Sequence, residues 1–209
     1  MIIIGVTGNS GAGKTTISTI IKNNSKALVI DADLLAKSLL KPGTEYYDKT
    51  IELFGKKILM PKPSKNKGKI DKAAFSKILF SDDKKREKMN ALTFKYVGQE
   101  IKKIILENKD REIIVIDAPL LYEGGFEKIC NYVIAVVAEE KTKIKRIMQR
   151  DKIHPNQASQ RISTQKNEDF YKEHANFIIE NNENTRYITL VKETLKIVHT
   201  IKDEANKAE

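Results

Sequence analysis

The chain has 209 residues, of which 40% are hydrophobic and 32% charged, so its composition is that of an ordinary globular protein with one sizeable core. Its longest apolar run, Tyr132 to Ala138, is far too short to cross a bilayer, and no basic segment precedes the apolar N-terminus as it would in a signal peptide. Cys130 is the only cysteine, which excludes an internal disulfide bond. These features predict a cytoplasmic protein without a membrane-spanning segment.

The formal net charge of +10 is of a size found in many proteins that bind nucleic acids or other polyanions. The basic residues, however, are 32 lysines and only six arginines, a ratio that indicates a general use of lysine on solvated faces. We therefore expect no nucleic-acid partner. Three of the six arginines fall within sixteen residues, which favours phosphate binding because each guanidinium can donate paired hydrogen bonds.

Apolar runs and helical periodicity alternate along the chain. In chain order, the pattern predicts a strand over 2–6, a helix over 15–23, a strand over 27–30, helices over 32–40 and 45–54, a mobile loop over 55–69, helices over 71–79 and 82–108, strands over 112–117 and 132–137, a helix over 139–150, a helix that begins at Pro155, a strand over 177–180 and a helix over 189–205.

Short apolar strands separated by helices are typical of a parallel sheet that is covered on both faces. We therefore predict an α/β fold with a five-stranded, parallel, doubly wound sheet in one domain over 1–209. Its core is expected to comprise 1–54, 111–138 and 175–209. The helical segment 55–110 is expected to be an insertion outside the sheet, and 139–174 a lid.

The segment between the first strand and the first helix matches the phosphate-binding pattern G-x-x-x-x-G-K-[ST]. It is Gly8-Asn9-Ser10-Gly11-Ala12-Gly13-Lys14-Thr15, followed by Thr16, and we expect Asn9 to Thr16 to bind the nucleotide. Glycines let such a loop curl so that backbone N–H groups converge on phosphate oxygens, and the next helix adds its positive dipole end. Lys14 is expected to reach the β- and γ-phosphates of ATP, and Thr15 to bind Mg²⁺. A plain surface turn is the weaker alternative, because the motif also lies between a strand and a helix.

Two carboxylates, Asp31 and Asp33, follow the second predicted strand. Ligands of parallel α/β sheets bind beyond the carboxyl ends of the strands, so both residues are expected on the side of the phosphate-binding loop. N-capping of the next helix is an equally good interpretation for Asp31. Asp33 is the better functional candidate, either as a catalytic group that accepts the proton of an attacking hydroxyl or as a metal ligand.

Asp117 ends the third predicted strand after four apolar residues. This is the placement of a Walker B acid, which supports Mg²⁺ in P-loop proteins. A polar residue at a simple strand-end turn is the alternative.

Arg146 and Arg150 have helical i, i+4 spacing, and Arg161 and Gln165 repeat it on the next predicted helix. We expect catalytic arginines here, on a lid that closes over the triphosphate and offsets charge during phosphoryl transfer, with Arg146 also in contact with the nucleotide. Surface salt bridges, for instance with Glu140 or Asp151, are the alternative.

Two large classes of P-loop protein lack support in the sequence. GTPases need an Asn-Lys-x-Asp element late in the sheet, whereas the nearest string, residues 108–111, lacks the final Asp and precedes the third strand. Ring ATPases need Glu after the Walker B Asp, and here Ala118 follows. Small size, a helical insertion and an Arg-bearing lid favour a small-molecule kinase.

At this level the sequence resembles the dephospho-coenzyme A kinase family nearly end to end. The most specific match is Asp117-Ala118-Pro119-Leu120-Leu121-Tyr122-Glu123, which generic nucleotide kinases do not carry. Further matches are the residues 4–8, 14–16, 31–37 and 68–71, Lys145-Arg146, Gln149-Arg150-Asp151, Arg161-Ile162, Gln165, Ala175 and Asn181.

The resemblance implies ATP- and Mg²⁺-dependent phosphorylation of the ribose 3′-hydroxyl of dephospho-CoA, the last step of coenzyme A synthesis. It also implies that 55–110 binds the acceptor and that Asp33 lies near the acceptor hydroxyl. The chain departs from the family's usual residues at Lys72, Thr93-Phe94 and Asn176. Another nucleoside or nucleotide kinase is the nearest rival function, and a nucleotide-dependent nucleic-acid-binding protein a remote one. We expect a monomer or weak homo-oligomer.

Overall fold

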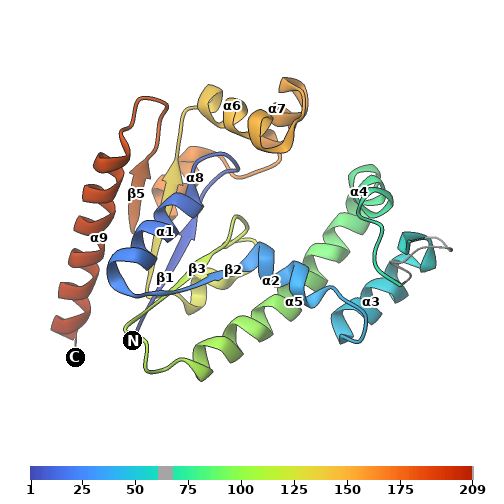
Figure 1. Cartoon of the computed structure of the whole chain (residues 1–209), viewed down its shortest axis with the longest axis horizontal. Helices are drawn as coiled ribbons and strands as arrows, with labels where there is room; N and C mark the ends of the chain where they lie inside the picture. Colours follow the sequence, from blue (N-terminus) through green and yellow to red (C-terminus); the bar gives the residue numbers. More distant parts are fainter. Residues whose placement is uncertain (61–67, 209) are drawn as a thin grey trace. The chain divides into compact units, whose positions relative to one another are not determined.

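The computed structural model describes residues 1–60 and 68–208. Within them, one sheet has the strand order β2-β3-β1-β4-β5, and all of its pairings are parallel (Figure 1). The strands are β1 (Ile2–Thr7), β2 (Leu28–Asp31), β3 (Ile113–Asp117), β4 (Tyr132–Val137) and β5 (Phe177–Glu180). The predicted five-stranded parallel sheet is therefore confirmed.

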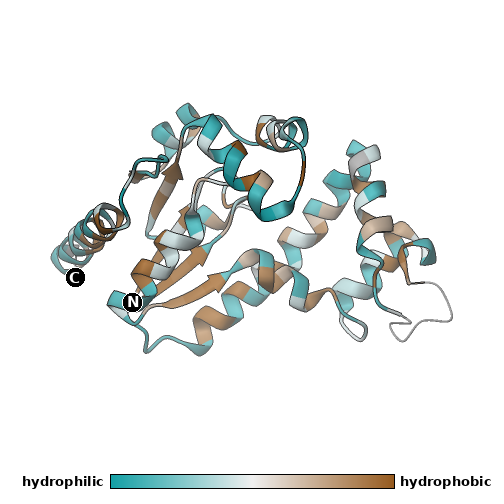
Figure 2. Cartoon of the chain, turned by 45° about the horizontal axis from the view of Figure 1, so that its top comes forward, coloured by the Kyte–Doolittle hydropathy of each residue, from teal (hydrophilic) through white to brown (hydrophobic). Residues whose placement is uncertain are grey.

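Both faces of the sheet are covered, because alternate residues of one strand pack in different hydrophobic clusters. Ile134 and Val136 of β4 pack in a large cluster with α1 (Lys14–Ser25) and α9 (Tyr187–Ala208). Ala135 and Val137 instead pack with Tyr171 of α8 (Glu168–His174). The strands are accordingly apolar over most of their length (Figure 2). This is the doubly wound arrangement that the run of buried strands predicts.

The strand and helix boundaries differ from the expected ones in a few places. The other elements of the sheet-containing part are η2 (Phe126–Ile129), α6 (Glu140–Asp151) and α7 (Pro155–Ser163). Helix α8 is absent from the expectation because its 7 residues are too few to show helical periodicity; the Asn167 side chain caps it by accepting from the Phe170 N–H. Asp31 was expected to follow β2 but is its last residue.

The described residues form two compact units, 1–31 with 108–209 and 32–107. The second unit consists of helices: α2 (Ala32–Leu39), α3 (Glu45–Phe54), η1 (Lys56–Ile58), α4 (Lys72–Ser81) and α5 (Asp83–Glu107). It has its own hydrophobic core, which includes Tyr46, Phe54, Phe75 and Tyr96. Thus α2 and α3, which were grouped with the core over 1–54, pack with α5 in the helical unit.

The loop expected over 55–69 falls partly on 61–67, which lie outside the described residues. On either side of that stretch, η1 follows α3, and Leu59 forms an antiparallel bridge with Ile70. Among the residues that the structure describes, no helix is long and apolar enough to cross a membrane.

Candidate active site

The phosphate-binding loop connects β1 to α1 and depends on glycine for its shape. Gly8, Gly11 and Gly13 have φ angles of 130°, 80° and 104°, which other residues rarely adopt. A Cβ atom at Gly8 would lie 2.1 Å from the Val136 carbonyl oxygen, and one at Gly13 would lie 2.1 Å from Asn181 Nδ2. The glycines of the motif therefore permit both the curl of the loop and its close approach to β4 and to the residues after β5.

Lys14 lies across this loop rather than in solvent. Its side chain is buried, and Nζ donates to the carbonyl oxygens of Gly8 (3.0 Å) and Asn9 (3.2 Å). Helix α1 begins after Gly13 without a side-chain cap, so no side-chain acceptor competes with an anion at its positive N-terminal end. The cation and the helix terminus together form the phosphate-binding arrangement that the motif predicts.

Asp117 lies at the carboxyl end of β3, in register with Val6 of β1 and Asp31 of β2. Its side chain is buried, with 5% exposed, and Oδ2 accepts a hydrogen bond of 3.0 Å from the Ser18 hydroxyl of α1. Thr15 lies one helical turn before Ser18 and is exposed. Hydroxyl and carboxylate oxygens are the ligands that Mg²⁺ prefers.

The described residues contain no group of three or more His, Cys, Asp or Glu side chains that could hold a metal by themselves. Magnesium in phosphoryl-transfer sites is usually bound by one or two carboxylates together with substrate phosphates and water. The donor set of Thr15 and Asp117 therefore fits a magnesium ion carried by the nucleotide.

Arg146 of α6 ties the phosphate-binding loop to the chain after β5. One of its terminal nitrogens, Nη1, donates to the carbonyl oxygens of Gly11 (3.1 Å) and Asn181 (2.9 Å). Nη2 donates to Asn181 Oδ1 (3.2 Å), whose amide nitrogen donates in turn to the Ala12 carbonyl (2.8 Å). Burial lowers the pKa of the Arg146 guanidinium, which the charge of Glu183 partly offsets. Arg146 thus lies against the phosphate-binding loop, and its predicted contact with the nucleotide stays a prediction.

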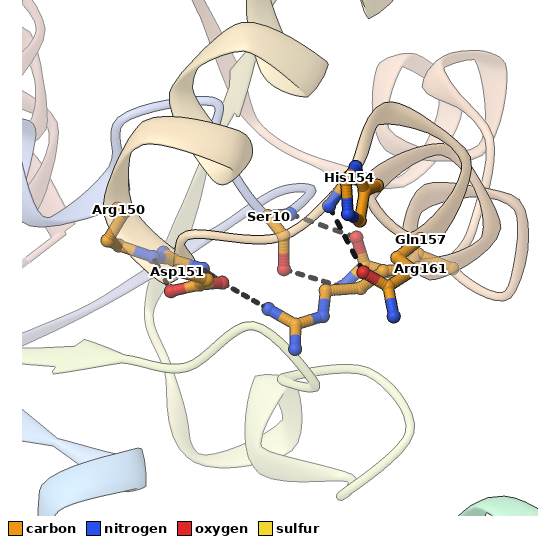
Figure 3. Close-up of polar contacts among 7 residues, drawn as sticks. Ser10, Arg150, Asp151, His154, Gln157 and Arg161 are labelled. Carbon is orange, nitrogen blue, oxygen red and sulfur yellow. Dashed lines mark hydrogen bonds and ion pairs between the residues drawn. The ribbon is translucent and has the colours of Figure 1, made fainter.

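Arg150 and Arg161 have a different partner. Arg150 donates to both carboxylate oxygens of Asp151, at 2.8 and 2.9 Å, and Arg161 also pairs with Asp151 (Figure 3). The Arg150 guanidinium, with a smaller contribution from Arg161, holds the pKa of the Asp151 carboxyl below its usual range. The structure therefore contains the ion pairs with Asp151 that were the alternative interpretation of these arginines, and a catalytic role for Arg150 stays a prediction.

The segment after α7 also contacts the phosphate-binding loop. Gln165 Oε1 accepts from the Ser10 N–H at 2.9 Å, and its Nε2 donates to the Ser10 hydroxyl at 3.3 Å. The Asn9 side-chain amide donates to the Lys166 carbonyl at 2.9 Å. The expectation that Arg161 and Gln165 share a helix face is wrong, because α7 ends at Ser163.

Asp33 lies in the first turn of α2, in the helical unit, and is exposed. The chain reaches it directly from Asp31, the last residue of β2. Its role as base or metal ligand stays a prediction.

The loop after Asp117 is held by packing. The Ala118 N–H donates to the Val6 carbonyl at 3.0 Å, and the Tyr122 ring packs edge-on against Phe170 with 5.1 Å between the ring centroids. Burial, assisted by the charge of Glu127, raises the pKa of Tyr122 to about 12, so this phenol stays protonated at neutral pH. Residues 118–123, which follow Asp117 and carry the most specific resemblance, therefore form a loop whose position is fixed by packing.

A family model described as dephospho-CoA kinase matches residues 2–186 of the chain. The chain belongs to the dephospho-CoA kinase family. A dephospho-CoA kinase from Listeria monocytogenes is 34% identical over 186 residues, which cover 86% of this chain and 88% of that protein. One from Arabidopsis thaliana is 33% identical over 184 residues, covering 87% and 77%. Among solved structures, a dephospho-CoA kinase from Campylobacter jejuni has a TM-score of 0.66 and 26% identity, covering 97% of this chain and 98% of that one.

Family membership confirms the resemblance that was inferred from residues 117–123 and from the arginine-bearing segment 145–165. Two residues with contacts at the site were not assigned a function from the sequence. Ser18 belongs to no motif, and Asn181 was noted only as a family match at the last strand. Of the departures from the family's usual residues, Thr93 is part of the helical unit's packing, since its hydroxyl is 2.7 Å from the Tyr46 hydroxyl.

Proposed function

We propose that the chain transfers the γ-phosphate of ATP to the ribose 3′-hydroxyl of dephospho-CoA, giving coenzyme A and ADP. The observation that carries this proposal is the family match over residues 2–186, a range that includes the phosphate-binding loop with Lys14 and the strand-end residue Asp117. Use of ATP and dephospho-CoA is what the family's activity requires. A cytoplasmic location and a monomeric or weakly associated state remain predictions.

The nucleotide phosphates are bound by residues 9–16. Lys14 exchanges the Gly8 and Asn9 carbonyl oxygens for phosphate oxygens, because its ammonium group already lies across the loop. Thr15 and Asp117, with Asp33 as a further candidate, would hold Mg²⁺. When bound, this ion supplies positive charge that offsets the charge developing on the transferred phosphoryl group.

In the reaction, the 3′-oxygen of the acceptor forms a bond to the γ-phosphorus while the bond from that phosphorus to the β,γ-bridging oxygen breaks. Asp33 is proposed to orient the acceptor hydroxyl and to take its proton. Phosphoryl transfer through a loose transition state demands little of a base, so orientation is the larger part of this role.

Arg146 is proposed to contact the nucleotide and to offset charge during transfer. This proposal is supported by its position, since its guanidinium donates to the Gly11 carbonyl oxygen of the loop and to the Asn181 carbonyl oxygen after β5. Arg150 is proposed to act when the lid over 139–174 closes, which requires it to leave Asp151. The insertion over 55–110 is proposed to bind the acceptor.

The test is to incubate the purified protein with ATP, Mg²⁺ and dephospho-CoA, and to identify the product by mass. We expect a product with the mass of coenzyme A, one phosphate heavier than dephospho-CoA, and no product when ATP or dephospho-CoA is omitted. A panel of nucleosides and nucleotides as acceptors is the control. Comparable turnover of any of these, with none of dephospho-CoA, would contradict the proposal.

A further inference from the structure

The hydroxyl group of Ser18 is buried between α1 and β3. It donates to Asp117 Oδ2 at 3.0 Å, and the two side chains are only 2% and 5% exposed. A carboxylate that accepts a hydrogen bond in such a packed position has little freedom to rotate, because rotation would leave a buried donor unsatisfied. Ser18 therefore restricts the orientation of Asp117.

The helical register of α1 gives this contact a place in the site. Residues three apart lie on the same side of a helix, so Thr15 and Ser18 project from neighbouring turns of one face. Thr15, next to Lys14 at the start of α1, is exposed, whereas Ser18, one turn further along α1, is buried. One face of α1 thus carries the hydroxyl expected to bind Mg²⁺ and the hydroxyl that holds the carboxylate expected to support the same ion.

We propose that Ser18 is a positioning residue for the metal-bound nucleotide. By holding Oδ2 of Asp117, it presents the carboxylate in the orientation that the ion and its bound water require. This inference rests on the proposed function, because it takes Thr15 and Asp117 as the magnesium-supporting pair. The physical reason is that Mg²⁺ demands near-ideal octahedral geometry, and partners that orient its ligands typically change metal affinity by about 10–100-fold.

A purely structural role is the competing explanation, in which the hydroxyl only joins α1 to β3. The two can be separated by measuring ADP binding by calorimetry without an acceptor, once with Mg²⁺ and once with EDTA. The ratio of the two affinities measures how strongly metal and nucleotide are coupled. Ser18→Ala should reduce this ratio about tenfold and leave metal-free ADP binding unchanged. A lowered melting temperature with an unchanged ratio would overturn the inference.

Thr194→Val is a matched control for the loss of a buried hydroxyl. The Thr194 side chain is fully buried in α9, which packs against α1, and its Oγ1 has no hydrogen-bond partner within the described ranges. Because Thr194 lies outside the site, the variant should leave the ratio unchanged. A reduction equal to that of Ser18→Ala would show that the assay reports core packing, and would overturn the inference.

Asp117→Asn completes the test. If Ser18 acts through Asp117, then Ser18→Ala should have no further effect on the ratio in the Asp117→Asn background. An unchanged ratio in Asp117→Asn alone would refute the proposed metal role of Asp117, and with it the basis of this inference. A reduced ratio in Asp117→Asn together with a normal ratio in Ser18→Ala would refute the Ser18 inference alone and leave the proposed function standing.

Discussion

Arg146 and Arg150 carry the same charge one turn apart on α6, yet their surroundings differ completely. Arg146 is partly buried and donates to the backbone of the phosphate-binding loop and of the chain after β5. The side chain of Arg150 is 59% exposed and pairs with its sequence neighbour Asp151. Helical spacing therefore does not make two arginines equivalent, because their roles depend on the elements opposite them. Arg146, at the loop, is therefore expected to contribute more to turnover than Arg150, which contributes only after it has left Asp151.

The largest effect is expected from Lys14→Ala, which changes the phosphate-binding loop that Arg146 contacts. Lys14 offsets charge at the γ-phosphate, so its loss should lower turnover by about 10³-fold, measured by coenzyme A formation. Circular dichroism and the melting temperature should remain close to those of the wild type, since the hydrogen bonds from the ammonium group to the Gly8 and Asn9 carbonyl oxygens lie within the loop. An unfolded variant, or one of nearly normal activity, would show that the role is wrong.

Asp33→Asn should cost about 10²-fold in turnover, at the low end of the usual range for a general base, because the loose transition state asks little of one. ATP binding should be retained, since the substitution keeps the shape of the side chain. A magnesium titration separates the two roles of Asp33. Full recovery of turnover at high Mg²⁺ would exclude the base role and leave a metal-site residue.

The comparison on α6 can be tested directly with Arg146→Lys and Arg150→Lys as a matched pair. Both variants keep the charge but lose the planar guanidinium fork. We expect Arg146→Lys to lower turnover by about 10-fold or more and Arg150→Lys to have the smaller effect, with kcat and KM measured for ATP. An equal loss in Arg150→Lys would mean that Arg150 contributes as much as Arg146 once it has left Asp151. Unchanged kinetics in both variants would show that neither arginine takes part in catalysis.

The smallest effect is expected at Asp151, where the arginines hold the carboxyl pKa below its usual range. A depressed folded-state pKa contributes stability above the unfolded-state value of about 3.9, and this contribution is lost as the pH falls through the folded value. Asp151→Asn should therefore lower the free energy of unfolding at pH 7 by less than about 1 kcal/mol, as for other exposed ion pairs. Urea denaturation should show the difference shrinking toward pH 3. A difference independent of pH would point to packing instead of charge.

The strands and the phosphate-binding loop could be predicted because their signals are local. Buried parallel strands need continuous apolar runs, and the loop needs glycine where positive φ angles and close backbone approaches occur, as at Gly8 and Gly13. The arrangement of the helical unit could not be predicted in the same way. Helices α2 and α3 carry ordinary periodicity, and only packing shows that they belong with α5.

By itself, the sequence determined the fold class, the nucleotide-binding loop, Asp117 at the end of its strand, and the family. Only the tertiary structure decided which side chains meet. Ser18 and Asp117 are 99 residues apart, Ser10 and Gln165 are 155 apart, and Asn181 and Ala12 are 169 apart. No periodicity or motif encodes such pairs, because a hydrogen bond between distant residues exists only once the sheet has brought their elements together. The same reason separates Arg146 from Arg150, which the i, i+4 spacing alone had made alike.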